Sequence, residues 1–310
     1  RFGGIYIALG ARRFMEAEME FLTSIGIVAS HVLAALLWSS TKPERPGKKT
    51  DFEDIVGRSR KIQEVRTQID MAATSNATVL IEGESGTGKE LVARAIHKYG
   101  SRSQGPLITV DCGAIPDTLI ESELFGSRRG SFTGSTADRS GLIEAANKGT
   151  LFLDEISNTS PNLQVRLLRV LQEKEVRRIG DSKGRRVDVR LIAATNSNLE
   201  ELVGKGLFRQ DLYYRLNVLH ITIPPLRKRK EDIPDIAQVF LERLNKTNKT
   251  RKRFSTAALE QLTTGHYRGN VRELQNMVER AYVHAAESNA IKEVAVNSAS
   301  PGQEPGEVDS

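Results

Sequence analysis

The sequence predicts an α/β fold, with a mostly parallel sheet crossed by helices, followed by a small domain made only of helices. Two observations lead to this prediction. Between Asp51 and Pro225, short apolar runs alternate with segments of helical period, which is the pattern of strand–helix–strand crossovers. After the pair Pro224-Pro225 no strand pattern returns, and the remaining periodic segments are helical.

Size and composition place the chain among ordinary globular proteins. Its 310 residues exceed the roughly 100–200 of one domain. A composition of 39% hydrophobic and 27% charged residues fits neither a multi-span membrane protein nor a disordered chain. The net charge of +6 permits contact with a polyanion without requiring it. A single cysteine, Cys112, excludes an internal disulfide and favours a reducing compartment, so we expect a cytoplasmic protein.

The first residues form a separate region. An apolar stretch, Phe21 to Trp38, is long enough to span a thin bilayer, but it contains polar side chains and follows three glutamates, which favours a helix outside the membrane. With the strand-like run GGIYIAL before it, this helix resembles the C-terminal end of a GAF sensory domain, which we assign to residues 1–38. A polar linker follows at 39–50. Because the chain begins with Arg1, we expect it to be part of a longer protein.

The α/β domain is assigned to residues 51–225. Buried strands are expected at 78–81, 107–110, 150–153, 187–195 and 218–223. Helices are expected between them, with these residues on their apolar faces: Ile62, Val65, Ile69 and Ala72; Leu91, Val92, Ala95 and Ile96; Leu163, Leu167, Leu168 and Leu171.

The helical domain is assigned to residues 226–290, with helices at 232–244, 255–263 and 270–287. The third helix begins with Asn270 and Glu273, a pair that resembles a capping box. Residues 291–310 are of low complexity, and we expect a disordered tail.

The segment GESGTGKE directly follows the first strand and opens a helix, which is the context of a phosphate-binding P-loop. Backbone N–H groups of such a loop surround phosphate oxygens, and the ammonium of Lys89 faces the terminal phosphates. The alternative is a glycine-rich turn without a ligand. Glu90 stands where Ser or Thr usually ligates Mg²⁺, so a water or another carboxylate must take that place. The expected nucleotide-binding residues are Gly83, Glu84, Ser85, Gly86, Thr87, Gly88, Lys89 and Glu90.

Two carboxylates end the strand LFLDE. Asp154 is expected to hold Mg²⁺ through its water shell, and Glu155 to polarise an attacking water. In the absence of a P-loop, both would instead be interpreted as caps of the next helix. Asn196, at the end of the following strand, is expected to reach the same water or the γ-phosphate, or else to be a turn residue.

Six motifs occur in order: GESGTGKE, GTLFLDE, AATN, FRQDLYYRLNV, PPLRKRKEDI and GNVRELQN. Over residues 52–286 the chain therefore resembles the AAA+ domain of bacterial sigma-54-dependent transcriptional activators, in which Glu is usual at the position of Glu90. The resemblance implies an AAA+ P-loop NTPase core with a helical lid, and ATP hydrolysis with ATP and Mg²⁺ as cofactors.

The resemblance also implies roles for residues outside the P-loop. Arg209 and Arg215 would be arginine fingers that reach the nucleotide of a neighbouring subunit, which requires a homo-oligomeric ring, most simply a hexamer. Arg272 would sense the γ-phosphate, and Val56 and Gly57 would line the adenine pocket.

The partner is implied by the segment GSFTGS, which resembles the family's GAFTGA loop. That loop contacts sigma-54 and promoter DNA, and ATP hydrolysis moves it to convert closed promoter complexes of sigma-54 RNA polymerase to open ones. Two serines replace the family's alanines. The expected contact residues are Gly130, Ser131, Phe132, Thr133, Gly134 and Ser135. A second, basic hairpin is expected at 173–186, and its arginines, with Arg128 and Arg129, are expected to face promoter DNA or the nucleotide.

Two questions stay open. Asp111 stands where the family often has Asn; an ionised Asp cannot donate a hydrogen bond to Glu155, which puts the coupling of partner contact to hydrolysis in doubt.

The second question is the function itself. The alternative function is a nucleotide-binding regulator on the same scaffold that acts by protein contacts without remodelling sigma-54. A general AAA+ chaperone or loader ATPase is a third candidate function.

Overall fold

The computed structural model describes residues 52, 54–129, 138–285 and 288–294. Residues 1–50 and 51–310 form two separate units, and all of these described residues belong to the second. The expected GAF-like segment, the linker and the GSFTGS loop lie outside the described residues. Within the described ranges, no helix is long and apolar enough to cross a membrane.

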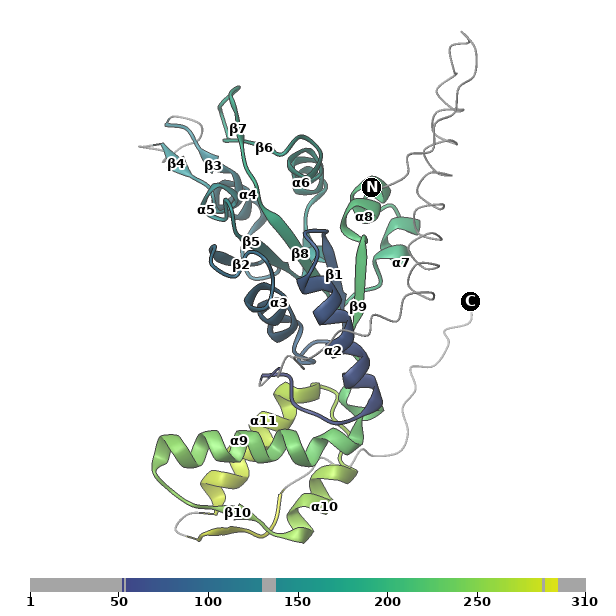
Figure 1. Ribbon diagram of the computed structural model, residues 1–310, viewed down its shortest axis with the longest axis vertical. Helices are drawn as coiled ribbons and strands as arrows, with labels where there is room; N and C mark the ends of the chain where they lie inside the picture. Colours follow the sequence, from purple (N-terminus) through teal and green to yellow (C-terminus); the bar gives the residue numbers. More distant parts are fainter. Residues whose placement is uncertain (1–51, 53, 130–137, 286–287, 295–310) are drawn as a thin grey trace, which may run out of the picture. The chain divides into compact units, whose positions relative to one another are not determined.

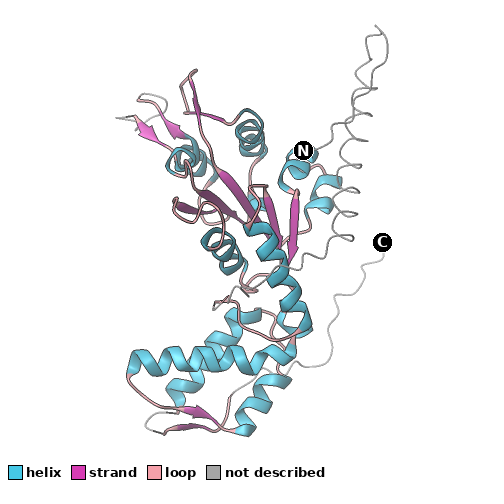
Figure 2. Ribbon diagram, viewed as in Figure 1, coloured by secondary structure: helices cyan, strands magenta, loops and turns pink. Residues whose placement is uncertain are grey.

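A five-stranded sheet lies at the centre of the α/β part (Figures 1 and 2), with strand order β2-β5-β8-β1-β9. All neighbouring strands are parallel. The strands are β1 (Val79–Glu82), β2 (Leu107–Asp111), β5 (Thr150–Asp154), β8 (Arg190–Thr195) and β9 (Leu219–Thr222). The predicted strands are confirmed, although the one expected from residue 187 begins at Arg190. The strand order reverses at β1, and in open α/β sheets ligands bind at such a point.

Helices cover both faces of the sheet. The helices of one face are α2 (Arg60–Ala73) and α3 (Lys89–Lys98). Those of the other are α4 (Asp117–Phe125), α5 (Leu142–Ala145), α6 (Pro161–Glu173), α7 (Leu199–Gly204) and α8 (Gln210–Leu216). Strand side chains alternate between the faces, because Leu151 and Leu153 join the second cluster while Phe152 joins the first.

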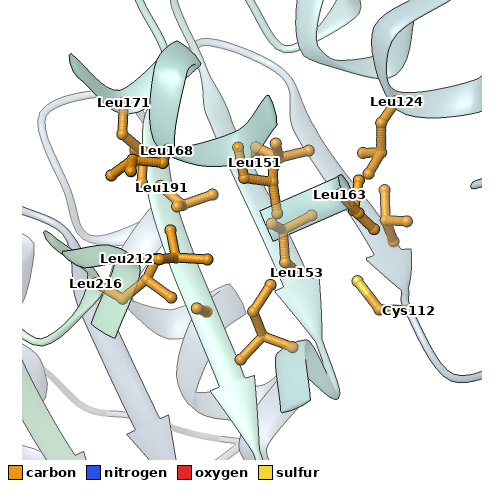
Figure 3. Close-up of a cluster of buried hydrophobic side chains, with 14 of the residues drawn as sticks. Cys112, Leu124, Leu151, Leu153, Leu163, Leu168, Leu171, Leu191, Leu212 and Leu216 are labelled. Carbon is orange, nitrogen blue, oxygen red and sulfur yellow. The ribbon is translucent and has the colours of Figure 1, made fainter. Parts of the chain in front are cut away.

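Leucines dominate the cluster on the second face (Figure 3), where those of α6 and α8 meet those of β5 and β8. Burying one such side chain contributes roughly 1.5–3 kcal/mol. The predicted apolar face of α6 is confirmed. In α3, Val92, Ala95 and Ile96 are buried as predicted, but Leu91 is 41% exposed and the prediction for it is wrong.

Two antiparallel hairpins lie side by side (Figure 1). One pairs β3 (Gly126–Ser127) with β4 (Arg139–Ser140) and brackets residues 130–137; the other pairs β6 (Glu175–Arg177) with β7 (Gly184–Arg186), which confirms the predicted second hairpin. The base of the first hairpin bonds to the turn that connects β6 with β7. The N–H of Ile179 in that turn donates to the carbonyl of Gly126 at 2.9 Å, and the N–H of Arg128 donates to the carbonyl of Ile179 at 3.0 Å. Backbone hydrogen bonds therefore hold the two hairpins together.

The lid contains α9 (Ile233–Asn248), α10 (Thr256–Thr264) and α11 (Asn270–His284), with a short parallel pair of β10 (Arg253–Phe254) and β11 (Ala290–Ile291). The three predicted helices are confirmed. Ile291 and Val294 are buried among them, so the ordered lid continues past residue 290, where the sequence suggested the start of a tail.

The predicted capping pair of α11 is only half right. The N-terminal cap is Gly269, whose N–H donates to Oε2 of Glu273 at 2.8 Å. Asn270 has a left-handed φ of +52°, and its side chain donates to Glu84 of the P-loop at 3.1 Å. A tertiary contact thus replaces the local cap that the sequence suggested.

Candidate active site

The P-loop joins β1 to α3. Gly86 and Gly88 have φ of +76° and +103°, a region that favours glycine. Lys89 begins α3 and is only 6% exposed. Its Nζ donates to the carbonyl of Gly83 at 2.9 Å and to Oε1 of Glu155 at 3.2 Å. The ammonium therefore lies between the loop and the end of β5, at the N-terminus of a helix.

The end of β5 supplies the two predicted carboxylates. The N–H of Glu155 donates to Oδ1 of Asp154 at 2.9 Å, and the N–H of Asn196 donates to Oε2 of Glu155 at 3.2 Å. The structure thus brings Lys89, Glu155 and Asn196 together. Asn196 takes part through its backbone, because its side-chain oxygen accepts a hydrogen bond from Ser197 at 3.0 Å.

These carboxylates suit a hydrated cation. Burial raises the pKa of Asp154, and the negative charges of Glu155 and Asp111 add to the shift. A divalent cation beside Asp154 would relieve this unfavourable charge. Within the described residues, no group of three His, Cys, Asp or Glu side chains is arranged as a metal site. Mg²⁺ commonly binds through one or two carboxylates, waters and phosphate oxygens, so the residues fit Mg²⁺ held in that manner.

Asp111 lies opposite Asp154 in the pairing of β2 with β5. Its Oδ1 accepts a hydrogen bond from the N–H of Gly113 at 2.8 Å. The carboxylate is therefore held by its own turn, two residues further along the chain, and it acts on Asp154 through charge alone.

An apolar cavity adjoins the P-loop. Its lining is mostly apolar, as is usual for small-molecule sites, and its volume is about 580 Å³ when the open solvent at its mouth is included. The cavity is lined by Asp54, Ile55, Val56, Ile62, Thr87, Gly88, Leu91, Val92, Ile223, Arg229, Ile236, Val239, Phe240, Arg243 and Val271. Val56 thus lies in its wall, and the exposure of Leu91 is explained because Leu91 lines the cavity. Gly57 does not line the cavity; a Cβ there would come within 2.6 Å of the Asp232 carboxyl carbon.

Asp232, which sequence reasoning did not assign to the site, anchors this wall. Its fully buried carboxylate accepts hydrogen bonds from the N–H groups of Arg58 and Ser59 at 2.8 and 2.7 Å, and from the Ser59 hydroxyl at 2.6 Å. The carboxylate therefore holds the chain next to Val56. Its signal in the sequence is the second of the two acidic residues within PPLRKRKEDI.

Arg229 belongs to the same motif and was also missed. It is 3% exposed and lines the cavity, and its Nη2 donates to the carbonyl of Thr87 at 3.2 Å. Burial lowers the pKa of Arg229, while the charge of Asp232 opposes that shift. Among the described residues, its Nε has no hydrogen-bond partner.

Three other residues that the sequence assigned to nucleotide binding are Arg272 of the lid, Glu84 of the P-loop and Glu90 of α3. Nη1 of Arg272 donates to the hydroxyl of Ser85 at 3.1 Å, so the lid arginine does lie at the P-loop. Glu84 accepts two hydrogen bonds from Arg227, at 2.7 and 2.6 Å, so its carboxylate faces the lid. Glu90 pairs with Arg94 at 2.6 Å along α3.

The two predicted fingers are not brought to this site. Arg209 donates twice to Asp211, at 3.0 and 2.7 Å, and Arg215 donates to the carbonyl of Leu171 at 3.4 Å. Sequence reasoning missed Gln164, which is 1% exposed and whose Oε1 accepts a hydrogen bond from the N–H of Arg209 at 2.9 Å. Its signal is a polar residue on the apolar face of α6.

The arginines of the second hairpin are largely neutralised within the chain. Arg178 donates to both carboxylate oxygens of Glu144, at 2.7 and 2.9 Å. Each of the others lies within 4.0 Å of a carboxylate: Arg177 of Glu173, Arg185 of Asp181 and Arg186 of Glu175. The expected basic surface is therefore weaker than a count of arginines suggests.

Residues 55–222, more than half of the chain, match the family described as the Sigma-54 interaction domain. The chain belongs to this family. Residues 227–308 match the AAA+ ATPase lid domain. This sigma-54 interaction domain therefore has an AAA+ P-loop NTPase fold with a mostly parallel sheet and a helical lid, and its family implies an ATPase that binds nucleotide. The comparisons do not show a GAF-like segment.

Relatives of this sigma-54 interaction domain are transcription regulators. It is 50% identical over 246 residues to the Nif-specific regulatory protein of Rhodobacter capsulatus, covering 79% of this chain and 42% of that protein. It is 51% identical over 245 residues to the transcriptional regulatory protein ZraR of Escherichia coli K12, covering 79% of this chain and 56% of ZraR. The chain thus spans about half the length of these relatives.

A solved structure shows the same fold. NtrX from Brucella abortus in complex with ADP superimposes with a TM-score of 0.72 and 31% sequence identity, over 91% of this chain and 59% of NtrX. NtrX has also been solved in complex with ATP.

Proposed function

We propose that this protein is an ATP-hydrolysing activator of sigma-54 RNA polymerase that acts in the cytoplasm. A ring of subunits, most simply a hexamer, hydrolyses ATP to ADP and phosphate, and moves the loop at residues 130–135 against the polymerase near promoter DNA. Closed promoter complexes thereby become open. The observation that carries the proposal is the contact of Lys89 with Glu155, beside Asp154, in a chain of the sigma-54 interaction family.

The residues of the site have distinct roles in this proposal. Lys89 and the N–H groups of the P-loop bind the phosphates. A phosphate competes with Glu155 for the Lys89 ammonium, which lies 3.2 Å from Oε1 of Glu155. Released from this pair, Glu155 accepts a proton from the attacking water. The N–H of Asn196, which donates to the other carboxylate oxygen, keeps Glu155 oriented.

Asp154 is proposed to hold Mg²⁺ through water molecules. The bound cation supplies positive charge against the phosphate oxygens. The support for this role is the half-buried carboxylate, whose pKa is raised by burial and by neighbouring negative charges. Asp154 also accepts the Glu155 N–H, so it orients the residue that receives the proton.

Arg209 and Arg215 are proposed to complete the site of a neighbouring subunit. Arg209 is held by Asp211, and the two side chains are 46% and 42% exposed. Water replaces such an exposed ion pair at low free-energy cost. Arg209 can therefore leave Asp211 to reach a phosphate of the neighbour, while the buried Gln164 keeps its backbone in place.

One observation favours a second candidate function, a nucleotide-bound regulator that does not remodel sigma-54. The Asp111 carboxylate is held by Gly113 and cannot donate a hydrogen bond to Glu155. Substituting Asp111→Asn supplies that donor and removes one negative charge. We expect it to change basal or polymerase-stimulated ATP turnover; unchanged values of both would exclude a coupling role for this position.

The deciding experiment measures open-complex formation by sigma-54 RNA polymerase with ATP. The protein should give open complexes. Glu155→Ala should bind ATP while turnover falls about 10²–10⁴-fold, the usual contribution of general-base catalysis. Phe132→Ala should retain ATP turnover and lose open complexes.

Failure of the intact protein to give open complexes while it hydrolyses ATP would favour the second candidate function. Failure to bind ATP at all would contradict both. These variants separate the two possibilities because Glu155 belongs to the chemical site and Phe132 to the loop.

A further inference from the structure

The Glu84 side chain lies at the junction of the P-loop and the lid and has no role in the proposed hydrolysis. Arg227, in the short helical turn η2 (Leu226–Lys228), donates to both of its carboxylate oxygens. Asn270, the first residue of α11, donates to Oε2 of Glu84 at 3.1 Å. The carboxylate is thus held by two segments more than 140 residues further along the chain.

Asn270 is fully buried and joins three segments. Its Nδ2 donates to the carbonyl of Ser85 at 3.0 Å as well as to Glu84, and its Oδ1 accepts the N–H of Leu226 at 2.8 Å. The P-loop, the turn η2 and the start of α11 therefore meet at one amide side chain. This arrangement requires the left-handed backbone of Asn270, a conformation that Asn tolerates better than most residues.

The start of α11 makes a further contact with the P-loop. The N–H groups of Val271 and Arg272 donate to the carbonyl of Gly86, at 2.9 and 3.3 Å. N–H groups in the first turn have no partner within their own helix, so this carbonyl satisfies them. The approach is close, because a Cβ on Gly86 would come within 2.3 Å of the Gly269 carbonyl oxygen.

These contacts orient the P-loop backbone. The carbonyl and N–H of a trans peptide point in opposite directions. Because the Ser85 carbonyl points to Asn270, the N–H of Gly86 points away from the lid, as a phosphate-binding donor must. The lid therefore holds the P-loop in a shape that suits a phosphate.

We propose that Glu84 is a positioning residue that latches the lid to the P-loop through Arg227 and Asn270, and so keeps Arg272 and the Gly86 N–H in place for the nucleotide. The inference rests on the proposed function, because it concerns the same nucleotide site. It assigns the Glu84 carboxylate to the lid and leaves phosphate binding to the loop backbone.

The test compares Glu84→Gln, Arg227→Gln and the double variant. One measurement is the release rate of a fluorescent ADP analogue, and the other is the distance between dyes on Ser101→Cys in the core and Ala257→Cys in the lid. Native Cys112 does not interfere, because it is buried and burial raises the pKa of its thiol to about 12. Glu64→Gln, which removes an exposed pair with Arg60 at 3.0 Å, is the matched control.

We expect each single variant to release the analogue about two- to fivefold faster, the range for a partly exposed ion pair. The double variant should be no faster than the faster single one, because both substitutions break the same contact. The dye distances should broaden in these variants and stay unchanged in Glu64→Gln.

Unchanged dye distances, or additive effects on release, would overturn the latch. The distance measurement needs no nucleotide. If the intact protein fails to bind the analogue, the proposed function fails while the dye distances still decide the latch.

Discussion

Individual buried polar side chains hold much of the backbone around this site in place. Gln164 lies on the apolar face of α6, yet both ends of its amide are used. It donates to the carbonyls of Thr159 and Leu207, at 2.9 and 3.2 Å, and accepts the N–H of Arg209. A buried polar side chain is tolerated because these hydrogen bonds offset its loss of hydration. Gln164 thereby fixes the backbone that carries a proposed arginine finger.

Replacing Gln164 tests this role. Gln164→Leu leaves backbone groups around it unsatisfied, so we expect a loss of about 1–3 kcal/mol in the free energy of unfolding, measured by urea denaturation. Gln238→Leu is the control, because Gln238 is exposed and donates only to Glu242 along α9; it should change stability by no more than about 0.5 kcal/mol. Equal effects of the two substitutions would contradict the role of Gln164.

The ionisation of Glu84 gives a prediction in pH. Hydrogen bonds from Arg227 lower its pKa from 4.5 to about 2 in the folded protein. A carboxyl with a depressed pKa stabilises the fold above its unfolded pKa and loses this contribution as pH falls through the folded value. The difference in melting temperature between the protein and Glu84→Gln should therefore be constant from about pH 5 to 8, and shrink as pH falls from 4.5 towards 2. A difference that grows in acid would contradict the assignment.

At the scale of elements, the hairpin β3–β4 shows how a glycine shapes the base of the loop that we propose contacts the polymerase. Gly126 has φ of +77°, and a Cβ there would come within 2.4 Å of the Arg139 carbonyl oxygen. Its own carbonyl accepts the N–H of Ile179 from the second hairpin. The base of the loop at 130–137 therefore depends on close backbone packing that no larger residue permits.

Gly126→Ala should destabilise the protein more than Gly206→Ala. Both glycines have positive φ, which costs a side chain roughly 1–2 kcal/mol, but Gly206 has no atom within 4 Å of a Cβ position. Only Gly126 adds a steric clash, so its variant should have the lower melting temperature while still binding ADP. Equal melting temperatures would show that the backbone at the hairpin base moves away from the added Cβ without a loss of stability.

At the scale of the whole molecule, the cavity that we propose binds the nucleotide lies where the core and the lid meet. Its wall includes Val56 from the segment before α2, Leu91 from α3 and Phe240 from α9. Asp232, at the end of the short turn η3 (Lys230–Asp232), ties the first of these segments to the lid. Neither part forms this cavity alone.

Asp232→Ala should therefore affect nucleotide binding and stability together. The variant loses three hydrogen bonds and leaves Arg229 buried without its carboxylate neighbour, and breaking such a buried arrangement costs about 3–5 kcal/mol. Asp235→Ala removes an exposed pair with Arg58 at 3.4 Å and should cost no more than about 1 kcal/mol. Thermal melting with and without ADP measures both effects; a normal shift by ADP in Asp232→Ala would contradict the anchoring role.

Prediction from sequence succeeded where the pattern is local. The five strands, the apolar face of α6, the P-loop and the carboxylates after β5 follow from runs of a few residues, whose periodicity reports which side is buried. Prediction from sequence was incomplete where a side chain has both local and distant partners available. Asn270 was interpreted as half of a capping box, but it bonds to Ser85 and Leu226, 185 and 44 residues away. Leu91 fitted the inner face of α3, but it lines the cavity.

The sequence alone therefore settles the family, the order of the elements and the identity of the P-loop, because each depends on neighbouring residues or on ordered motifs. The tertiary structure decides which of the many charged residues serve the site. Asp232 and Arg229 become its anchors because folding brings them to Ser59 and Thr87, 173 and 142 residues away, and buries them there. Removed from water, a charge must find a partner, and no local pattern specifies a partner so distant in the chain.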